Sequence, residues 1–126
     1  MTTEIDEIVI KGITYVPKGQ ENSLASKVDG LELVLIRTYS AGVHFGYLAK
    51  KESTLAGVEV KLINARRVYY WSGAASLSQM AMEGVTKPND CKISMPVSSI
   101  DLIAIEIIPI TEKAKGILGG VKEWKM

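Results

Sequence analysis

Hydrophobic residues along the chain fall into short runs, several of which alternate with polar residues, and turn-forming residues separate the runs. Residues 58–63 show the alternation best, because Val58, Val60 and Leu62 are spaced two apart. A period of two is typical of a half-buried β-strand. The pattern predicts strands over residues 8–16, 31–38, 43–50, 58–71, 93–97 and 102–108.

The polar segments between these runs predict the connections. Ser40-Ala41-Gly42 separates two runs by so little chain that it predicts a β-hairpin. Longer polar segments predict a surface loop over residues 18–30 and turns over residues 51–57 and 98–101.

Helical periodicity is confined to two short segments. A helix is expected over about residues 76–83, capped by Ser72 or Ser76 and ended by Gly84, and a second over residues 111–118. Successive strands without regularly interspersed helices predict an α+β fold, mostly antiparallel β-sheet with one or two short α-helices. The length of 126 residues predicts a single domain over residues 1–126.

Composition and charge narrow the classes of function. Hydrophobic residues make up 47% and charged residues 23%, the balance of a soluble globular protein. A formal net charge of +1 argues against a general nucleic-acid binder, and we expect no duplex nucleic acid as a partner. One Cys and one His exclude a cysteine-based zinc site and a two-histidine metal motif, so we expect neither a metal nor a cofactor.

The compartment is inferred from segments that the sequence lacks. The acidic, polar residues 1–7 are unlike a signal peptide. No apolar run approaches the roughly 20 residues that a membrane-spanning helix needs. We expect a cytoplasmic protein that does not associate with membranes.

No catalytic motif stands out, so we expect no enzymatic activity. His44 lies four residues after Ser40, but the chain has no Gly-x-Ser-x-Gly motif, no paired carboxylates and no phosphate-binding glycine loop. A hydrolase using Ser40 and His44 is the weakest alternative. His44 suits either a contact with a ligand or a local hydrogen bond within a strand.

The arginines suggest an anion-binding site. The chain has 12 Lys spread along its length, but only Arg37, Arg66 and Arg67 as arginines. Arginine is favoured where a phosphate is bound by two parallel hydrogen bonds. The alternative is that each arginine pairs with a carboxylate.

Aromatic and small residues follow the second arginine cluster. Tyr70 and Trp71 offer rings on which a base can stack, and Ser72 and Ser76 lie near the expected helix N-terminus, which attracts phosphate. The combination predicts a nucleotide pocket. The alternative is that Tyr69 and Trp71 face the core while Tyr70 covers the surface.

Three blocks of the sequence resemble a family of small phage-encoded proteins. They span residues 37–47 (RTYSAGVHFGY), 64–79 (NARRVYYWSGAASLSQ) and 107–114 (IIPITEKA). The family that they resemble includes the first-described Thoeris anti-defence proteins, which sequester cyclic ADP-ribose isomers made by bacterial TIR proteins without degrading them. Some members also bind cyclic oligonucleotides. The resemblance implies a homo-oligomer with pockets at or near subunit interfaces, acting in the host bacterial cytoplasm.

We therefore expect a phage protein that captures a cyclic nucleotide immune signal without degrading it. The three arginines would bind the pyrophosphate and an aromatic ring would stack on adenine, with neighbouring polar residues contacting ribose or phosphate. The expected ligand-binding residues are Arg37, Tyr39, Ser40, His44, Asn64, Arg66, Arg67, Tyr70, Trp71, Ser72 and Ser76. The main alternative is an inhibitor or structural module that binds a host protein through an aromatic surface patch.

Overall fold

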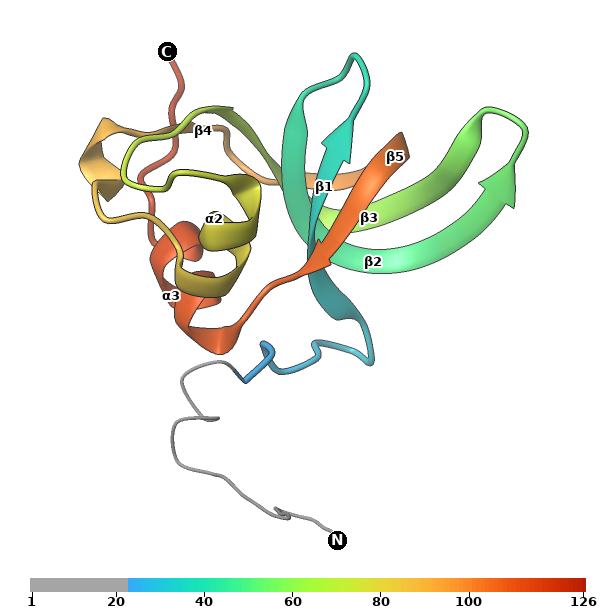
Figure 1. Cartoon of the computed structure of the whole chain (residues 1–126), viewed down its shortest axis with the longest axis horizontal. Helices are drawn as coiled ribbons and strands as arrows, with labels where there is room; N and C mark the ends of the chain where they lie inside the picture. Colours follow the sequence, from blue (N-terminus) through green and yellow to red (C-terminus); the bar gives the residue numbers. More distant parts are fainter. Residues whose placement is uncertain (1–22) are drawn as a thin grey trace, which may run out of the picture.

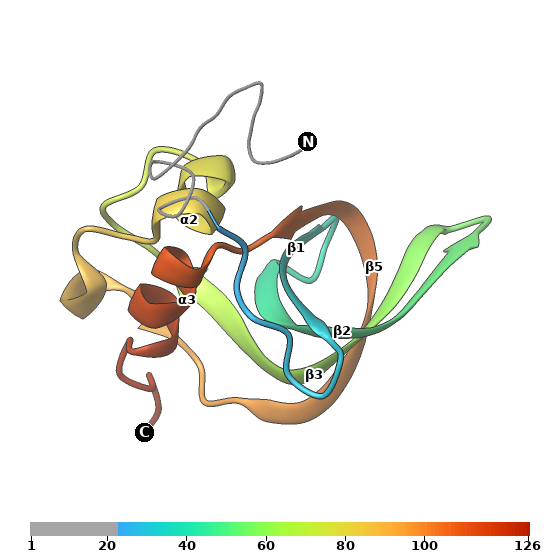
Figure 2. The ribbon, with the colours of Figure 1, turned by 90° about the horizontal axis from the view of Figure 1, so that it is seen from below.

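The structure is a computed structural model, and it describes residues 23–126 (Figure 1). The strand expected at residues 8–16 lies outside the described part. Within it, two short helices lie to one side of a single β-sheet, and Figure 2 shows the same separation from below. The elements are β1 (Glu32–Thr38), β2 (Val43–Thr54), β3 (Gly57–Tyr70), α2 (Leu77–Glu83), η1 (Pro88–Asp90), β4 (Lys92–Ile93), β5 (Val97–Pro109) and α3 (Glu112–Gly119).

Every strand pair in the sheet is antiparallel, which confirms the expected α+β class. β1 pairs with β2 and β5, and β3 pairs with β2, β5 and the short β4. Because β2 pairs with both β1 and β3, four strands form a closed ring, and β4 extends the sheet from β3. The predicted hairpin between β1 and β2 is confirmed.

Two predicted turns are wrong, because both segments belong to long strands. β2 continues to Thr54, which pairs with Gly57, so the turn is limited to the two residues between them. Residues 98–101 lie inside β5, where Ser99 pairs with Ile63 and Asp101 with Lys61. Polar side chains dominate these stretches since they face solvent, while the main chain stays paired.

The sheet buries side chains on both of its faces. Val34 and Ile36 of β1 point into the closed ring, whereas Leu33 and Leu35 point outward to the helices. All four are nearly inaccessible to solvent. A strand buried on both faces reads as a continuous apolar run, as residues 33–36 do.

Both predicted helices are confirmed, with capping residues that also join them. The Ser76 hydroxyl accepts the Gln79 main-chain N–H at the start of α2, and the Thr111 hydroxyl accepts the Ala114 N–H at the start of α3. The Thr111 hydroxyl donates in turn to the Met82 carbonyl of α2 at 2.7 Å. No helix among residues 23–126 is long and apolar enough to cross a membrane.

A bulge bends β2 and β3 where Gly46 faces two residues of the partner strand. The register shifts between Phe45 and Tyr47, and Asn64 adopts a positive φ of 54°. A β-carbon on Gly46 would lie 3.0 Å from Ala65, so only glycine permits this close approach. The bulge turns Asn64 toward the outer face of the sheet, where it lines a cavity.

Candidate functional site

A cavity of about 420 Å³ lies between the outer face of the sheet, the C-terminal end of α3 and the segment that follows it. Its floor is formed by the strands β1 to β3, and its walls by α3, the C-terminal segment and the loop between β4 and β5. The lining residues are Leu33, Phe45, Tyr47, Asn64, Arg66, Pro96, Lys115, Gly119, Val121, Lys122 and Glu123. A volume of this size suits a nucleotide-sized small molecule.

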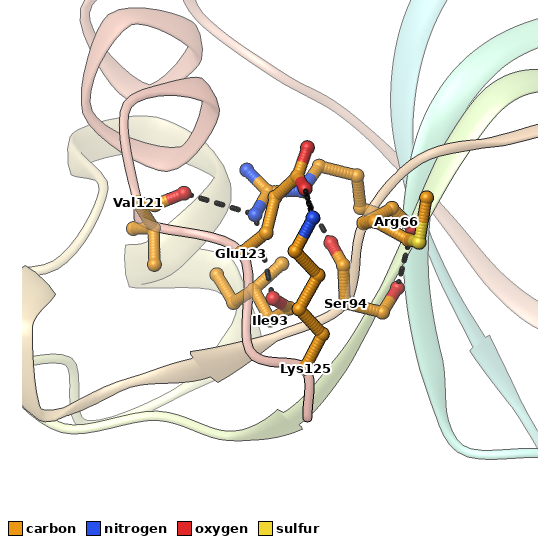
Figure 3. A network of polar contacts seen from close by, with 7 residues as sticks. Arg66, Ile93, Ser94, Val121, Glu123 and Lys125 are labelled. Atoms are coloured by element: carbon orange, nitrogen blue, oxygen red, sulfur yellow. Dashed lines mark hydrogen bonds and ion pairs between the residues drawn. The ribbon is translucent and has the colours of Figure 1, made fainter.

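Arg66 anchors one wall of the cavity (Figure 3). It is 7% exposed. Its guanidinium donates to five main-chain carbonyls, and Figure 3 shows the bonds to Ile93, Ser94 and Val121. The acceptors are Ile93, Ser94, Leu118, Gly119 and Val121, at 2.7–3.5 Å.

These bonds use the full donor capacity of the side chain. Burial lowers the pKa of the Arg66 guanidinium, whereas the negative charge of Glu123 raises it. The sequence predicted a phosphate contact for Arg66. In the structure its N–H groups instead tie α3 and the C-terminal segment to β4.

Three polar side chains of the cavity have no internal partner. The Asn64 amide and the ammonium groups of Lys115 and Lys122 make no hydrogen bond or ion pair with any residue of the described part. Lys115 lies on α3, and Lys122 lies just beyond that helix. Two ammonium groups at one cavity favour an anionic ligand.

Apolar and aromatic residues supply the rest of the surface. Phe45 and Tyr47 come from β2, and the Arg66 guanidinium lies 5.9 Å from the centroid of the Phe45 ring. Glu123 is the acidic residue of the lining, and its carboxylate pairs with Lys125 at 3.5 Å. The cavity therefore combines an aromatic surface with positive charge, which fits a base or another flat ring carrying phosphate.

The predicted site residues do not converge on one place. Asn64 and Arg66 line the cavity, but Arg37 lies elsewhere, with its Nε donating to Glu106 at 2.8 Å on the exposed surface. This pairing was the alternative expected for a single arginine. Arg67 packs beside Gly42 and over the Tyr69 ring, away from the cavity.

The predicted residues of the β1–β2 hairpin do not line the cavity. Tyr39 is 92% exposed and Ser40 is also exposed, at the turn between β1 and β2. His44 is 2% exposed, and its Nε2 lies 2.9 Å from the Ala41 carbonyl oxygen. Because that contact occupies Nε2, and no hydrogen bond joins His44 to Ser40, the hydrolase alternative has no support in the geometry.

The predicted aromatic and serine residues after β3 have local roles. The Trp71 indole donates to Ala74 and packs against the core, whereas Tyr70 is about half exposed. Ser72 donates its main-chain N–H to the Cys91 sulfur, and Ser76 caps α2. Tyr69 is also about half exposed, so the alternative in which Tyr69 and Trp71 both face the core holds for Trp71 but not for Tyr69. The register of β3 against β4 shifts between Val68 and Tyr70, which breaks the simple alternation.

Sequence reasoning missed most of the cavity. Tyr47, Lys115 and Lys122 looked like ordinary strand and surface residues, because nothing in their spacing links them. The sequence does show a lysine in the last helix and a short charged segment after it. These residues come together at the cavity only because α3 packs over β2 and β3, which the sequence pattern did not predict.

His44 makes the stability depend on pH. Burial lowers its pKa below the ordinary value of 6.5, the Ala41 hydrogen bond raises it, and the charge of Arg67 lowers it. The unfolded chain therefore binds more protons below pH 6.5 than the folded chain. We expect the free energy of unfolding to decrease as the pH falls from about 6.5, and urea denaturation at several pH values measures this. The His44→Gln variant should lack this part of the dependence, and an identical pH profile for both proteins would contradict the assignment.

Comparison with known families adds one finding. A family model described as a domain of unknown function, DUF6948, matches residues 31–118. The chain belongs to this family. The matched region runs from the start of β1 to the end of α3, so the DUF6948 domain includes the sheet and both helices, whereas Val121, Lys122 and Glu123 of the cavity wall follow it. No curated protein and no solved structure matches the chain significantly.

Proposed function

We propose that this protein binds a phosphorylated nucleotide in the cavity between β2, β3 and α3, and that it holds the ligand without converting it. One observation carries the proposal: the unpartnered Lys115, Lys122 and Asn64 side chains lie with Tyr47 around a cavity of about 420 Å³. The two ammonium groups would bind phosphate, Tyr47 would contact the base, and the Asn64 amide would hydrogen-bond to ribose or base.

The lining residues supply binding groups rather than a catalytic arrangement. Glu123 is paired with Lys125, and Arg66 is bonded to carbonyl oxygens, so neither is poised as a general base or a nucleophile. Among residues 23–126 no cluster of His, Cys, Asp or Glu has the composition of a metal site. These features support a binding protein.

The biological role that we propose is sequestration of a cyclic nucleotide immune signal by a phage protein in the host cytoplasm. This role rests on the resemblance of residues 37–47, 64–79 and 107–114 to the Thoeris anti-defence proteins. A cyclic ADP-ribose isomer carries a pyrophosphate and an adenine, which match the two lysines and the tyrosine. A homo-oligomer remains part of this proposal.

The proposal is tested by recovering the ligand. The full-length protein is incubated with a panel of cyclic ADP-ribose isomers and cyclic oligonucleotides, separated from free ligand and heated, and the released species are identified by mass spectrometry. We expect one class of nucleotide to be retained and released intact. Retention of none would contradict binding, and release of a cleaved product would replace sequestration with hydrolysis.

A further inference from the structure

Three exposed side chains and the partly buried Arg67 form a continuous series beside the C-terminal segment. The Arg67 guanidinium carbon lies 5.2 Å from the Tyr69 ring centroid, Tyr69 and Trp124 have centroids 5.2 Å apart, and the Lys92 ammonium lies 5.4 Å from the Trp124 ring. We call these residues the cation–aromatic series. Tyr69 is 53% exposed and Trp124 is 49% exposed, so both rings remain accessible.

The main chain fixes the residues of this series in place. Arg67 and Tyr69 belong to β3, and Lys92 belongs to β4, which pairs with β3. The main-chain N–H of Trp124 donates to the Ile93 carbonyl at 2.8 Å, which holds the C-terminal segment beside β4. The rings are therefore preorganised for a partner.

The two cations of the series have no counter-charge. Neither the Arg67 guanidinium nor the Lys92 ammonium forms an ion pair or a hydrogen bond with any residue between 23 and 126. The other arginines of the chain are occupied, since Arg37 pairs with Glu106 and Arg66 bonds to carbonyls. Arg67 is thus the arginine of the described part that has no hydrogen-bond or ion-pair partner for its guanidinium.

We propose that the cation–aromatic series binds single-stranded nucleic acid, with phosphates at Arg67 and Lys92 and bases against Tyr69 and Trp124. Half-exposed rings between two unpaired cations match a ligand that alternates flat rings with negative charges. An acidic peptide would use the cations but would leave the rings without a matching group. Stacking on the Tyr69 and Trp124 rings and phosphate contacts at Arg67 and Lys92 do not depend on which base is bound, so we expect little preference for base sequence.

This inference is independent of the nucleotide proposed for the cavity. Arg66 and Arg67 are adjacent on β3, so their side chains leave opposite faces of the strand. Likewise, Glu123 lines the cavity while its neighbour Trp124 stacks on Tyr69. The two sites meet at the C-terminal segment, where Lys122 and Glu123 line a second cavity together with Trp124. Variants of Lys115 on α3 and of Arg67 on β3 keep the two sites separate.

Fluorescence anisotropy of a labelled 15-nucleotide oligo(dT) with the full-length protein tests the proposal. We expect a dissociation constant below about 100 µM at low salt. Two phosphate contacts predict a slope of about −1.4 for the logarithm of the association constant against the logarithm of salt concentration. Trp124→Ala should weaken binding about tenfold, and Arg67→Ala and Lys92→Ala should each weaken it and make the slope shallower.

The Lys115→Ala variant is the matched control. It removes a positive charge at the cavity, and Lys115 does not line the second cavity that contains Trp124, so this variant should bind the oligonucleotide as tightly as the parent protein. Lack of oligonucleotide binding would overturn the proposal. So would binding that the three series variants leave unchanged. Capture of polyglutamate in place of oligo(dT), with the same dependence on Arg67 and Lys92, would assign the surface to an acidic protein partner instead.

Discussion

Arg66→Ala should lower the free energy of unfolding by about 3 kcal/mol or more. The substitution removes one donor from each of five main-chain carbonyls that come from β4, its flanking residue, α3 and the C-terminal segment. The Ile93 and Leu118 carbonyls keep a second donor, from the main-chain N–H of Trp124 and of Val121. It also empties a buried volume next to Phe45. Unpaired carbonyls and a new void both destabilise the folded state.

Urea denaturation measures this loss, and the neighbouring arginine is the control. Arg67→Ala removes the same side chain from a half-exposed position without hydrogen bonds, so we expect a change below about 1 kcal/mol. Arg66→Lys should also be destabilising, because an ammonium group cannot reproduce the planar set of five donors. Equal effects of Arg66→Ala and Arg67→Ala would show that the carbonyl network does not hold the C-terminal segment.

Gly73→Ala should destabilise the fold by about 2 kcal/mol or more. Gly73 has a φ of 94°, which L-amino acids rarely adopt. A β-carbon there would lie 2.5 Å from the Thr86 hydroxyl and 2.6 Å from the main-chain nitrogens of Thr86 and Lys87. The clash would break the hydrogen bond from the Thr86 N–H to the Gly73 carbonyl, which closes the loop containing α2.

Thermal denaturation of the Gly73→Ala variant measures this destabilisation. The Gly116→Ala variant is the control, because it introduces the same methyl group at a glycine where no clash is expected. Gly116 lies within α3, and a β-carbon there would meet nothing within 4 Å. Gly116→Ala should therefore stabilise the protein by up to about 1 kcal/mol. An unchanged melting temperature for Gly73→Ala would mean that the loop between β3 and η1 adopts another path.

The hydrophobic pattern was enough to predict the elements, but not how far they extend. Residues 31–38 and the helix capped by Ser76 were predicted almost to the residue, because burial and capping are local signals. Residues 51–54 and 98–101 were taken for turns because their side chains are polar. In the structure their main chains pair in long strands whose side chains face solvent. Closure of the ring through β2 and β3 depends on contacts between distant segments, which alternation does not encode.

Residue type was a weaker guide to the site than to the fold. Arginine was read as an anion ligand, but Arg66 satisfies main-chain carbonyls and Arg37 pairs with Glu106. Asn64 lines the cavity because of the bulge opposite Gly46 rather than because of its neighbouring arginines, and its contact with a ligand stays a prediction. The packing of α3 against the sheet brings Lys115 and Lys122 to the same cavity, and their spacing along the chain does not predict this.

Titration calorimetry with a cyclic ADP-ribose isomer tests the central claim most directly, using the parent protein, Lys115→Ala/Lys122→Ala and Lys113→Ala. Lys113 lies on the same helix as Lys115 but does not line the cavity, so it controls for the loss of charge. Binding in the cavity predicts an affinity at least about tenfold weaker for the double variant and unchanged for Lys113→Ala. Equal affinity of the parent and the double variant, or no binding by the parent protein, would contradict the claim.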